Sequence, residues 1–183
     1  MVMVDWEIKS YISDGLVSIS PYDESLVNPN SIDLRLSDGF ITFGPTFHAI
    51  DPYNQQDISN CGKPFATPDI TINPGDFILG SSIEKITLPD NICAEVTGKS
   101  SLARLGIDVH KTAGWIDAGF SGTITFEISN CGMYPIKLKS GMTFAQLIFH
   151  KTEHCKIPYG NKPGSKYQGQ QGPTKSRYYR NKL

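Results

Sequence analysis

The sequence lacks several patterns that would assign it to a membrane or secreted class. It has no run of about 18 apolar residues, so a membrane-spanning helix is disfavoured. The N-terminal stretch MVMVDWEIKS has an aspartate where a secretory signal peptide is apolar, which argues against export. No two of the four cysteines form a C-x-x-C pair, so no zinc knuckle or dithiol redox site is indicated. Scattered cysteines are typical of reduced thiols, and we expect a cytoplasmic protein.

Three further absences narrow the chemistry. The zinc-dependent deaminases need H-x-E and P-C-x-x-C, and no histidine of this chain is followed by x-Glu. A cupin-type metal site would need H-x-H, which is also missing. The phosphate-binding loop G-x-x-x-x-G-K-[ST] does not occur. We therefore expect neither zinc nor any metal held by protein side chains alone.

The last segment of the chain has no acidic residue, although the whole chain has a formal net charge of −1. The body that precedes it has 11 basic and 18 acidic residues. A basic arm on an acidic body indicates a polyanionic partner, and nucleic acid and a small triphosphate are the two candidates. The six basic residues within 158–183 are Lys162, Lys166, Lys175, Arg177, Arg180 and Lys182.

Turn-forming residues are abundant: 17 glycines and 12 prolines in 183 residues favour many short strands over long helices. The clearest predicted strand is Thr123–Ser129, where isoleucine and phenylalanine alternate with polar residues. The dipeptide Asp38-Gly39 predicts a hairpin between two further strands. These two and the other predicted strands are Ser31–Leu36, Phe40–Phe43, Ile70–Ile72, Phe77–Leu79, Ile83–Ile86, Ile136–Leu138 and Phe144–Phe149.

Two short helices are expected beside the strands. Residues 4–14 form an amphipathic pattern with Asp5 as N-cap and Gly15 at the C′ position. Residues 100–105 form a second helix with Ser100 as N-cap and a glycine after its end. Recurring strands and turns predict a mainly β fold, either a sandwich, a jelly roll or a barrel. We divide the chain into a β domain, 1–157, and a basic C-terminal arm, 158–183.

Four segments carry residues suited to chemistry, each with a plainer alternative. Gly98–Arg104 combines a helix N-terminus, two hydroxyls, a lysine and an arginine, which can bind an anion or form an ordinary capped helix. Asp117 lies among three glycines, either facing a ligand or within a simple turn. Glu127 lies opposite the apolar side of its strand, either solvated or in a pocket at an interface. The arm is either a ligand-binding flap or a flexible tail.

In this order, the segments resemble the dCTP deaminase family of the trimeric dUTPase superfamily. The resemblance rests on GKSSLARLGIDVHKTAGWIDAGFSGTITFEISN, on GMTFAQLIF, and on PYGNKPGSKYQGQQGPTKSR in the arm. It is close from Gly98 to Arg177 and looser before that, where SIDLRLSDGF also fits. The specific feature is G-[KR]-S-S-L-x-R followed by T-A-x-x-I-D-x-G-[FW]-x-G at this separation.

The resemblance implies a homotrimer of distorted jelly rolls, the dUTPase-like β-barrel, with active sites at subunit interfaces. Each site is expected to bind dCTP or dUTP, with Mg²⁺ held by the phosphates. Nucleic-acid and membrane partners are not expected. The family also makes dTTP a candidate inhibitor, acting on the loop around Thr112 and Ala113.

The resemblance also implies residue roles. Glu127 falls on the catalytic glutamate, which takes a proton from the attacking water and delivers it to the cytosine and then to ammonia. Ser100, Arg104 and the carbonyl of Ala113 fall on positions that orient this water, and Asp117 on the residue that meets the sugar 3′-hydroxyl. The nucleotide-binding positions are Lys99, Ser100, Ser101, Leu102, Ala103, Arg104, Asp117, Thr125, Phe126, Glu127, Gln146, Tyr159, Lys166 and Gln170.

Some members of this family stop at dUTP, and others also cleave it to dUMP, which supplies thymidylate synthesis, and pyrophosphate. Single-activity bacterial members typically have T-A-H-R-I-D, whereas this chain has Gly114-Trp115 in place of His-Arg. That difference and the tail GSKYQGQQGPT resemble bifunctional members, in which Asp117 would polarise a second water. We therefore expect a bifunctional, zinc-independent hydrolase. A deaminase that releases dUTP is the alternative, and a plain dUTPase or a nucleic-acid-binding β module ranks lower.

Overall fold

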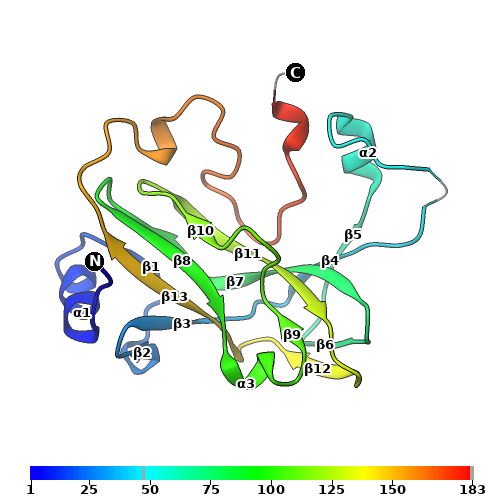
Figure 1. Ribbon diagram of the computed structural model, residues 1–183, viewed down its shortest axis with the longest axis horizontal. Helices are drawn as coiled ribbons and strands as arrows, with labels where there is room; N and C mark the ends of the chain where they lie inside the picture. The colour runs from blue at the N-terminus through cyan, green and yellow to red at the C-terminus, as the bar shows by residue number, and fades with distance from the viewer. Residues whose placement is uncertain (47, 182–183) are drawn as a thin grey trace.

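The computed structural model describes residues 1–46 and 48–181, and two antiparallel sheets dominate it (Figure 1). The six-stranded sheet has the order β5 (Lys63–Ala66), β4 (Gly39–Thr42), β7 (Phe77–Thr87), β11 (Ser121–Asn130) and β9 (Ile107–Asp108), and β1 (Ser18–Ser20) also pairs with β7. The five-stranded sheet has the order β10 (Trp115–Ile116), β8 (Ile92–Gly98), β13 (Thr143–Lys151), β3 (Ser31–Arg35) and β2 (Val27–Asn28). A separate pair joins β12 (Ile136–Lys139) to β6 (Asp69–Ile72).

Helices are short throughout the described residues, so the mainly β class is confirmed. The α-helices are α1 (Asp5–Ser13), α2 (Gln55–Asn60) and α3 (Ser100–Ala103), and the 3₁₀ turns are η1 (Glu24–Leu26), η2 (Tyr159–Asn161) and η3 (Tyr178–Arg180). None of these helices is long and apolar enough to cross a membrane.

The two sheets share one hydrophobic core. Ile124, Phe126 and Ile128 are buried along one side of β11, which confirms the predicted alternation. The Phe126 ring contacts Phe144 of the opposite sheet, with centroids 5.2 Å apart. Full burial of such a side chain contributes about 1.5–3 kcal/mol. The other side of β11 is thereby left for polar residues, among them Glu127.

Both predicted helices form, but the N-cap of each lies one residue earlier than expected. Asp5 is the first helical residue rather than the N-cap, because Val4 precedes α1 and its N–H donates to the Glu7 carboxylate at 3.1 Å. Ser100 is likewise the first residue of α3, and Lys99 occupies the N-cap position. Gly15 follows α1 with φ +71°, as its predicted C′ role requires.

The predicted hairpin around Asp38-Gly39 is wrong. β3 and β4 belong to different sheets, because β3 pairs with β13 while β4 pairs with β7. Gly39 does not have the positive φ that a tight hairpin turn needs. Instead, the chain crosses between sheets here: the Leu36 N–H donates to Met142 at 3.0 Å, and the next N–H, from Ser37, donates to Ser81 at 2.8 Å.

Several other boundaries differ from the prediction. The segments Phe77–Leu79 and Ile83–Ile86 belong to one continuous strand, β7. β8 was not predicted, because apolar and polar residues do not alternate clearly along Ile92–Gly98, although Pro89 marks a turn before it. The segment 44–69, for which the sequence offered no interpretation, contains α2 and β5.

The C-terminal arm packs along the free edge of β11 rather than extending into solvent. Gly169 donates its N–H to the Ser121 carbonyl at 2.7 Å, and Thr123 donates to the Gln170 carbonyl at 3.0 Å. The Gln170 side-chain amide returns a bond to the Thr123 carbonyl at 2.7 Å. Lys182, one of the six basic residues counted in the arm, lies outside the described residues.

Candidate active site

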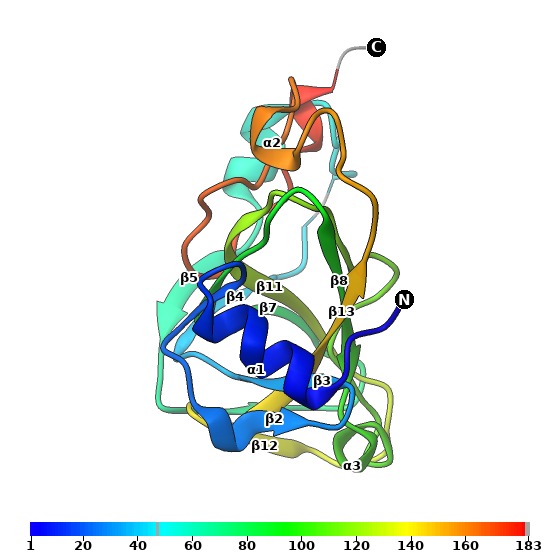
Figure 2. The same cartoon turned by 90° about the vertical axis from the view of Figure 1, so that its left-hand side faces the viewer.

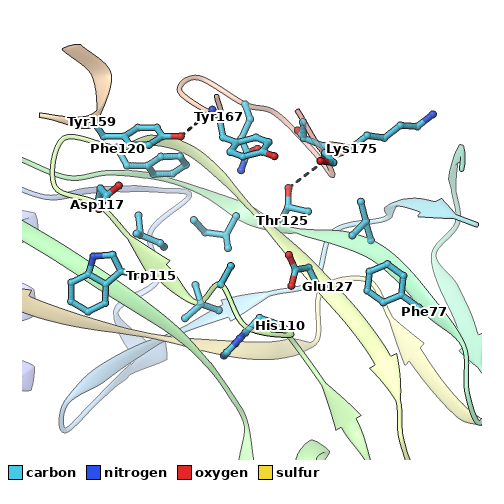
Figure 3. A pocket seen from close by; sticks show the side chains of 18 of the residues that line it. Phe77, His110, Trp115, Asp117, Phe120, Thr125, Glu127, Tyr159, Tyr167 and Lys175 are labelled. Atoms are coloured by element: carbon cyan, nitrogen blue, oxygen red, sulfur yellow. Dashed lines mark hydrogen bonds between the residues drawn. The ribbon is translucent and has the colours of Figure 1, made fainter. Parts of the chain in front are cut away.

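A cleft of about 520 Å³ lies mainly between three parts of the chain (Figure 3). These parts are the polar side of β11, the loop between β9 and β10 with the turn after β10, and the C-terminal arm. Residues far apart in sequence therefore converge on one concave site. The predicted site residues that line it are Ala113, Trp115, Asp117, Thr125, Glu127, Tyr159 and Gln170.

Glu127 is half-buried on the floor of this cleft, on the polar side of β11. Its Oε2 accepts a hydrogen bond from the Lys111 backbone N–H at 2.9 Å, while its own N–H donates to the Val109 carbonyl at 3.0 Å. In the part of the chain that the structure describes, no group bonds to the other carboxylate oxygen, Oε1. A carboxylate fixed by one oxygen and open at the other can accept a proton from a bound water.

Asp117 follows β10 and is exposed at the other end of the cleft (Figure 3). Its carbonyl accepts the Phe120 N–H at 3.2 Å, which closes a turn through Gly119. Gly119 has φ +83°, and a Cβ there would lie 2.4 Å from the Pro158 Cβ. Only glycine therefore lets the arm begin against this turn, where the Tyr159 N–H donates to Ala118 at 2.8 Å.

Close packing also leaves no space for a side chain at Gly114. Its carbonyl accepts the Val96 N–H at 2.7 Å, and an added Cβ would lie 2.7 Å from the Val96 carbonyl and 3.2 Å from the His110 ring. Trp115 beside it is 57% exposed, with its ring 5.5 Å from that of His150. The dipeptide Gly114-Trp115 thus places a small residue inside the loop and a large one at the cleft margin.

The arm closes the top of the cleft through a set of hydrogen bonds. The Tyr159 hydroxyl accepts the N–H groups of Lys166 and Tyr167 at 3.2 and 3.1 Å, which folds the arm back on itself. Farther along, the Thr174 N–H donates to the Thr125 hydroxyl at 3.2 Å (Figure 3). Lys175 donates to the Ser59 carbonyl at 2.8 Å, which ties the arm to α2.

The remaining predicted site residues lie elsewhere. α3, which carries Ser100, Ser101, Leu102 and Ala103 and is followed by Arg104, is at the opposite end of the molecule from the arm in both views (Figures 1 and 2).

Other predicted residues are held by different partners. Lys99 forms an ion pair with Asp33 at 2.5 Å, and the Gln146 amide donates to the Ser31 hydroxyl at 3.3 Å. Phe126 is buried in the core beneath Thr125 and Glu127, and neither Lys166 nor Gly114 lines the cleft.

Comparison with known proteins identifies the family. A family model described as dCTP deaminase-like matches residues 2–152. The chain belongs to the dCTP deaminase-like family. A protein named "dCTP deaminase, dUMP-forming" from Methanospirillum hungatei is 44% identical over 182 residues, covering 100% of this chain and 98% of the relative. The protein of the same name from Mycobacterium tuberculosis is 46% identical over 185 residues, covering 99% and 97%.

A solved structure agrees with the fold. The crystal structure of 2′-deoxycytidine 5′-triphosphate deaminase from Agrobacterium tumefaciens aligns with a TM-score of 0.65 at 23% identity. The match covers 82% of this chain and 48% of that one, so the chain spans about half the length of that protein. At this identity the likeness supports the fold of the dCTP deaminase-like family and nothing finer.

The cleft of this family member includes residues that sequence reasoning missed. Phe43, Cys61 and Phe77 line one wall, although their segments gave no functional signal. Two others had a signal: Tyr167 lies within the quoted arm motif, and His110 lies between two quoted motifs. The Nδ1 atom of His110 is buried and has no hydrogen-bond partner among the described residues.

The acids of the cleft do not form a metal-binding group. Among residues 1–46 and 48–181, no three His, Cys, Asp or Glu side chains are arranged to hold a metal ion. Asp117 and Glu127, the two acids that line the cleft, come from different elements. Mg²⁺ is usually held by one or two carboxylates together with substrate phosphates, and the cleft offers two carboxylates for such an arrangement.

Proposed function

We propose that this protein is a bifunctional hydrolase that converts dCTP and two waters into dUMP, pyrophosphate and ammonia. The observation that carries the proposal is that Glu127 and Asp117 face one cleft, which the arm covers. Full-length relatives at 42–46% identity named "dCTP deaminase, dUMP-forming" support it.

The first reaction is hydrolytic deamination. The open Oε1 of Glu127 takes a proton from water as the oxygen attacks C4 of the cytosine, and the proton then passes to N3. The tetrahedral centre collapses with loss of the amino group, which leaves as ammonia after a second proton transfer through Glu127. The products are dUTP and ammonia, and the glutamate is regenerated. Ala113 lines the cleft, and its carbonyl would orient this water.

The second reaction breaks the bond between the α-phosphorus and the bridging oxygen to the β-phosphate. Asp117 polarises a second water, whose oxygen attacks the α-phosphorus, and pyrophosphate leaves. Gly114 stands where single-activity members have a bulky residue, and it lets the loop pack against Val96 and His110, where a side chain would not fit. The Asp117 carboxylate also meets the 3′-hydroxyl, so it both binds the sugar and activates the water.

A triphosphate needs cationic groups, and Lys99 and Arg104, the residues that flank α3, offer them. We propose a homotrimer in which Lys99–Arg104 of one subunit faces the cleft of the next, together with Gln146. The arm, residues 158–183, closes over the bound nucleotide through Tyr159, Lys166 and Gln170. Mg²⁺ bound to the phosphates would share in neutralising their charge. Thr125 lies next to the base, and Phe126, whose side chain is buried in the core, can offer only its backbone there.

Two extensions complete the proposal. dTTP, which shares the sugar and triphosphate, competes for the same cleft and inhibits through the loop at Thr112 and Ala113. The enzyme acts on the nucleotide pool of the cytoplasm. The alternative, a deaminase that stops at dUTP, would use the same Glu127 but leave Asp117 as a sugar ligand only.

The test is a pair of time courses of the purified protein with Mg²⁺, one with dCTP and one with dUTP, with nucleotides separated by anion-exchange chromatography. We expect dUMP and pyrophosphate from the first time points, without accumulation of free dUTP. dUTP as the end product would reduce the protein to a deaminase. Intact dCTP together with cleaved dUTP would identify a plain dUTPase, and no turnover of either would overturn the assignment.

A further inference from the structure

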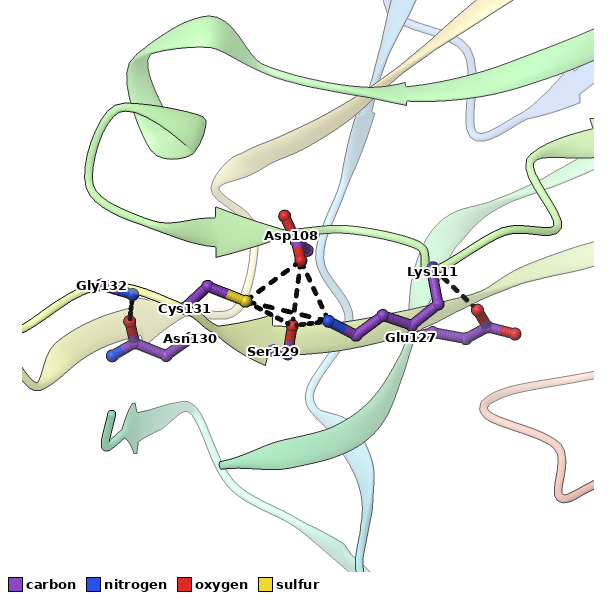
Figure 4. A network of polar contacts seen from close by, with 7 residues as sticks. All are labelled: Asp108, Lys111, Glu127, Ser129, Asn130, Cys131 and Gly132. Carbon is purple, nitrogen blue, oxygen red and sulfur yellow. Dashed lines mark hydrogen bonds and ion pairs between the residues drawn. The ribbon is translucent and has the colours of Figure 1, made fainter. Parts of the chain in front are cut away.

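A polar network outside the cleft lies beside Glu127 (Figure 4). The Lys111 ammonium donates to Asp108 Oδ2 at 3.0 Å and to the Ser129 hydroxyl. The Ser129 hydroxyl and the Cys131 thiol also approach that Asp108 oxygen, at 3.2 and 3.3 Å. The Lys111 ammonium holds the pKa of Asp108 below its ordinary value, and Asp108 raises the pKa of Lys111. The pair is therefore charged at neutral pH.

The sheet dictates where this network lies. Asp108 of β9 is the cross-strand partner of Ser129 of β11, so the two acceptors for the Lys111 ammonium come from paired strands. Ser129 and Glu127 are two residues apart on the same side of β11. Lys111 spans the distance between them: its backbone N–H contacts Glu127 Oε2 and its ammonium contacts Ser129 (Figure 4).

Few hydrogen bonds other than those of Lys111 hold the loop that carries this residue. Residues 109–114 contain no helix or strand. The ends of this loop are anchored by backbone bonds, from Glu127 to the Val109 carbonyl and from Val96 to the Gly114 carbonyl. Between these ends, the hydrogen bonds that the loop makes within the described residues all come from Lys111.

We propose that Asp108, Ser129 and the Lys111 side chain are positioning residues for Glu127. By anchoring the Lys111 ammonium on β9 and β11, they keep the Lys111 N–H against Oε2 and thereby leave Oε1 toward the cleft. This inference rests on the proposed function, in which Glu127 is the base. A displaced base costs turnover because proton transfer needs a reactive geometry, while substrate binding is affected far less.

The experiment measures kcat and KM for dCTP in Lys111→Met and Asp108→Asn. Lys111→Met keeps the backbone N–H and the side-chain length but removes the ammonium. We expect kcat to fall about tenfold in each variant with KM within about twofold, because the base is misplaced rather than the ligand site altered. Lys111→Arg, which retains a cationic donor, should recover most of the activity.

The matched control is Lys137→Met. Lys137 pairs with Asp69 at the same 3.0 Å as Lys111 with Asp108, and both pairs are partly exposed. Lys137 lies on β12, outside the cleft, and its loss should leave kcat unchanged. Equal kcat values for Lys111→Met and Lys137→Met would overturn the inference. If Lys111→Met does not fold, Ser129→Ala, which removes one acceptor, provides the same comparison with a smaller expected loss.

A double variant separates this inference from the proposed function. In Glu127→Gln, adding Lys111→Met should cause no further loss of kcat, because the network acts through Glu127. A further tenfold loss would mean that the network acts elsewhere and would contradict the inference. If Glu127→Gln alone retains full activity, the role proposed for Glu127 fails, whatever the network variants do.

Discussion

The cleft and α3 differ in how completely one chain builds them. Asp117, Thr125 and Glu127 line a cleft whose walls come from β11, the turn after β10 and the arm. Ser100, Ser101 and Arg104 of the α3 region are exposed, and among the described residues no side-chain hydrogen bond or ion pair involves the Arg104 guanidinium. One chain therefore forms the cleft, whereas the donors that we propose bind the triphosphate face outward at the other end.

This contrast supports the proposal that a second subunit completes the site. In the proposed function, the exposed donors and the cleft bind one nucleotide together, although they lie on different surfaces of one chain. Contacts between two such different surfaces are heterologous, and they close into a ring when the rotation between subunits allows it. A three-membered ring would give each cleft the α3 of its neighbour, in accord with the proposed homotrimer.

The largest expected effect is that of Glu127→Gln, which tests the cleft side of the comparison. It keeps the shape of the side chain but removes the base, so deamination of dCTP should fall by about 10²–10⁴-fold. Cleavage of added dUTP should persist. The rate is measured as ammonia release, with Glu153→Gln, an exposed glutamate outside the cleft, as the control. Unchanged deamination would remove Glu127 from the mechanism.

Asp117→Asn separates the two reactions within the cleft. Pyrophosphate release should fall by about 10²-fold while dCTP still binds and is deaminated, because the amide can still accept a bond from the 3′-hydroxyl but no longer activates the second water. dUTP should then accumulate, as followed by anion-exchange chromatography. An equal loss in nucleotide binding and pyrophosphate release would mean that Asp117 serves only as a sugar ligand.

Gly114→Ala tests whether close packing within one chain preorganises the cleft. The added Cβ would lie 2.7 Å from the Val96 carbonyl, so the loop must shift, and we expect about 1–3 kcal/mol of destabilisation. Urea unfolding measures this against Gly44→Ala, where a Cβ meets nothing within 4 Å. Equal stability of the two variants would show that the loop can shift without cost and that packing does not require a glycine at this position.

The strand that forms the floor of the cleft could be predicted from the sequence better than the order of the strands in the sheets. Thr123–Ser129 was found because one face of β11 is buried and the other is polar, and this alternation is a local property. The supposed hairpin at Asp38-Gly39 failed because the choice of sheet for β4 depends on pairing with β7, which is distant in sequence. For the same reason, Phe43 and Cys61 reach the cleft only through tertiary packing, and no local pattern marks them.

The smallest expected effect concerns the acid stability of Asp108→Asn. The pKa of Asp108 lies below its ordinary value of 3.8, so its ion pair stabilises the fold above that pH. This stabilisation is lost as the pH falls through the lowered pKa. Since the pair is partly exposed, we expect a difference of at most about 1 kcal/mol near neutral pH. Urea unfolding at several pH values should show the gap closing below pH 3.8. A gap that widens in acid would contradict the assignment.

The most direct test of a site shared between subunits mixes two inactive variants. Arg104→Ala changes only the region around α3, and Glu127→Gln changes only the cleft. Each variant alone should have little deaminase activity. If the two residues meet across an interface, co-expressed hybrid trimers contain some sites in which both are intact, about a quarter at random mixing. We predict that ammonia release from dCTP recovers in proportion. Hybrids as inactive as the separate variants would place both residues in one subunit's site and contradict the account.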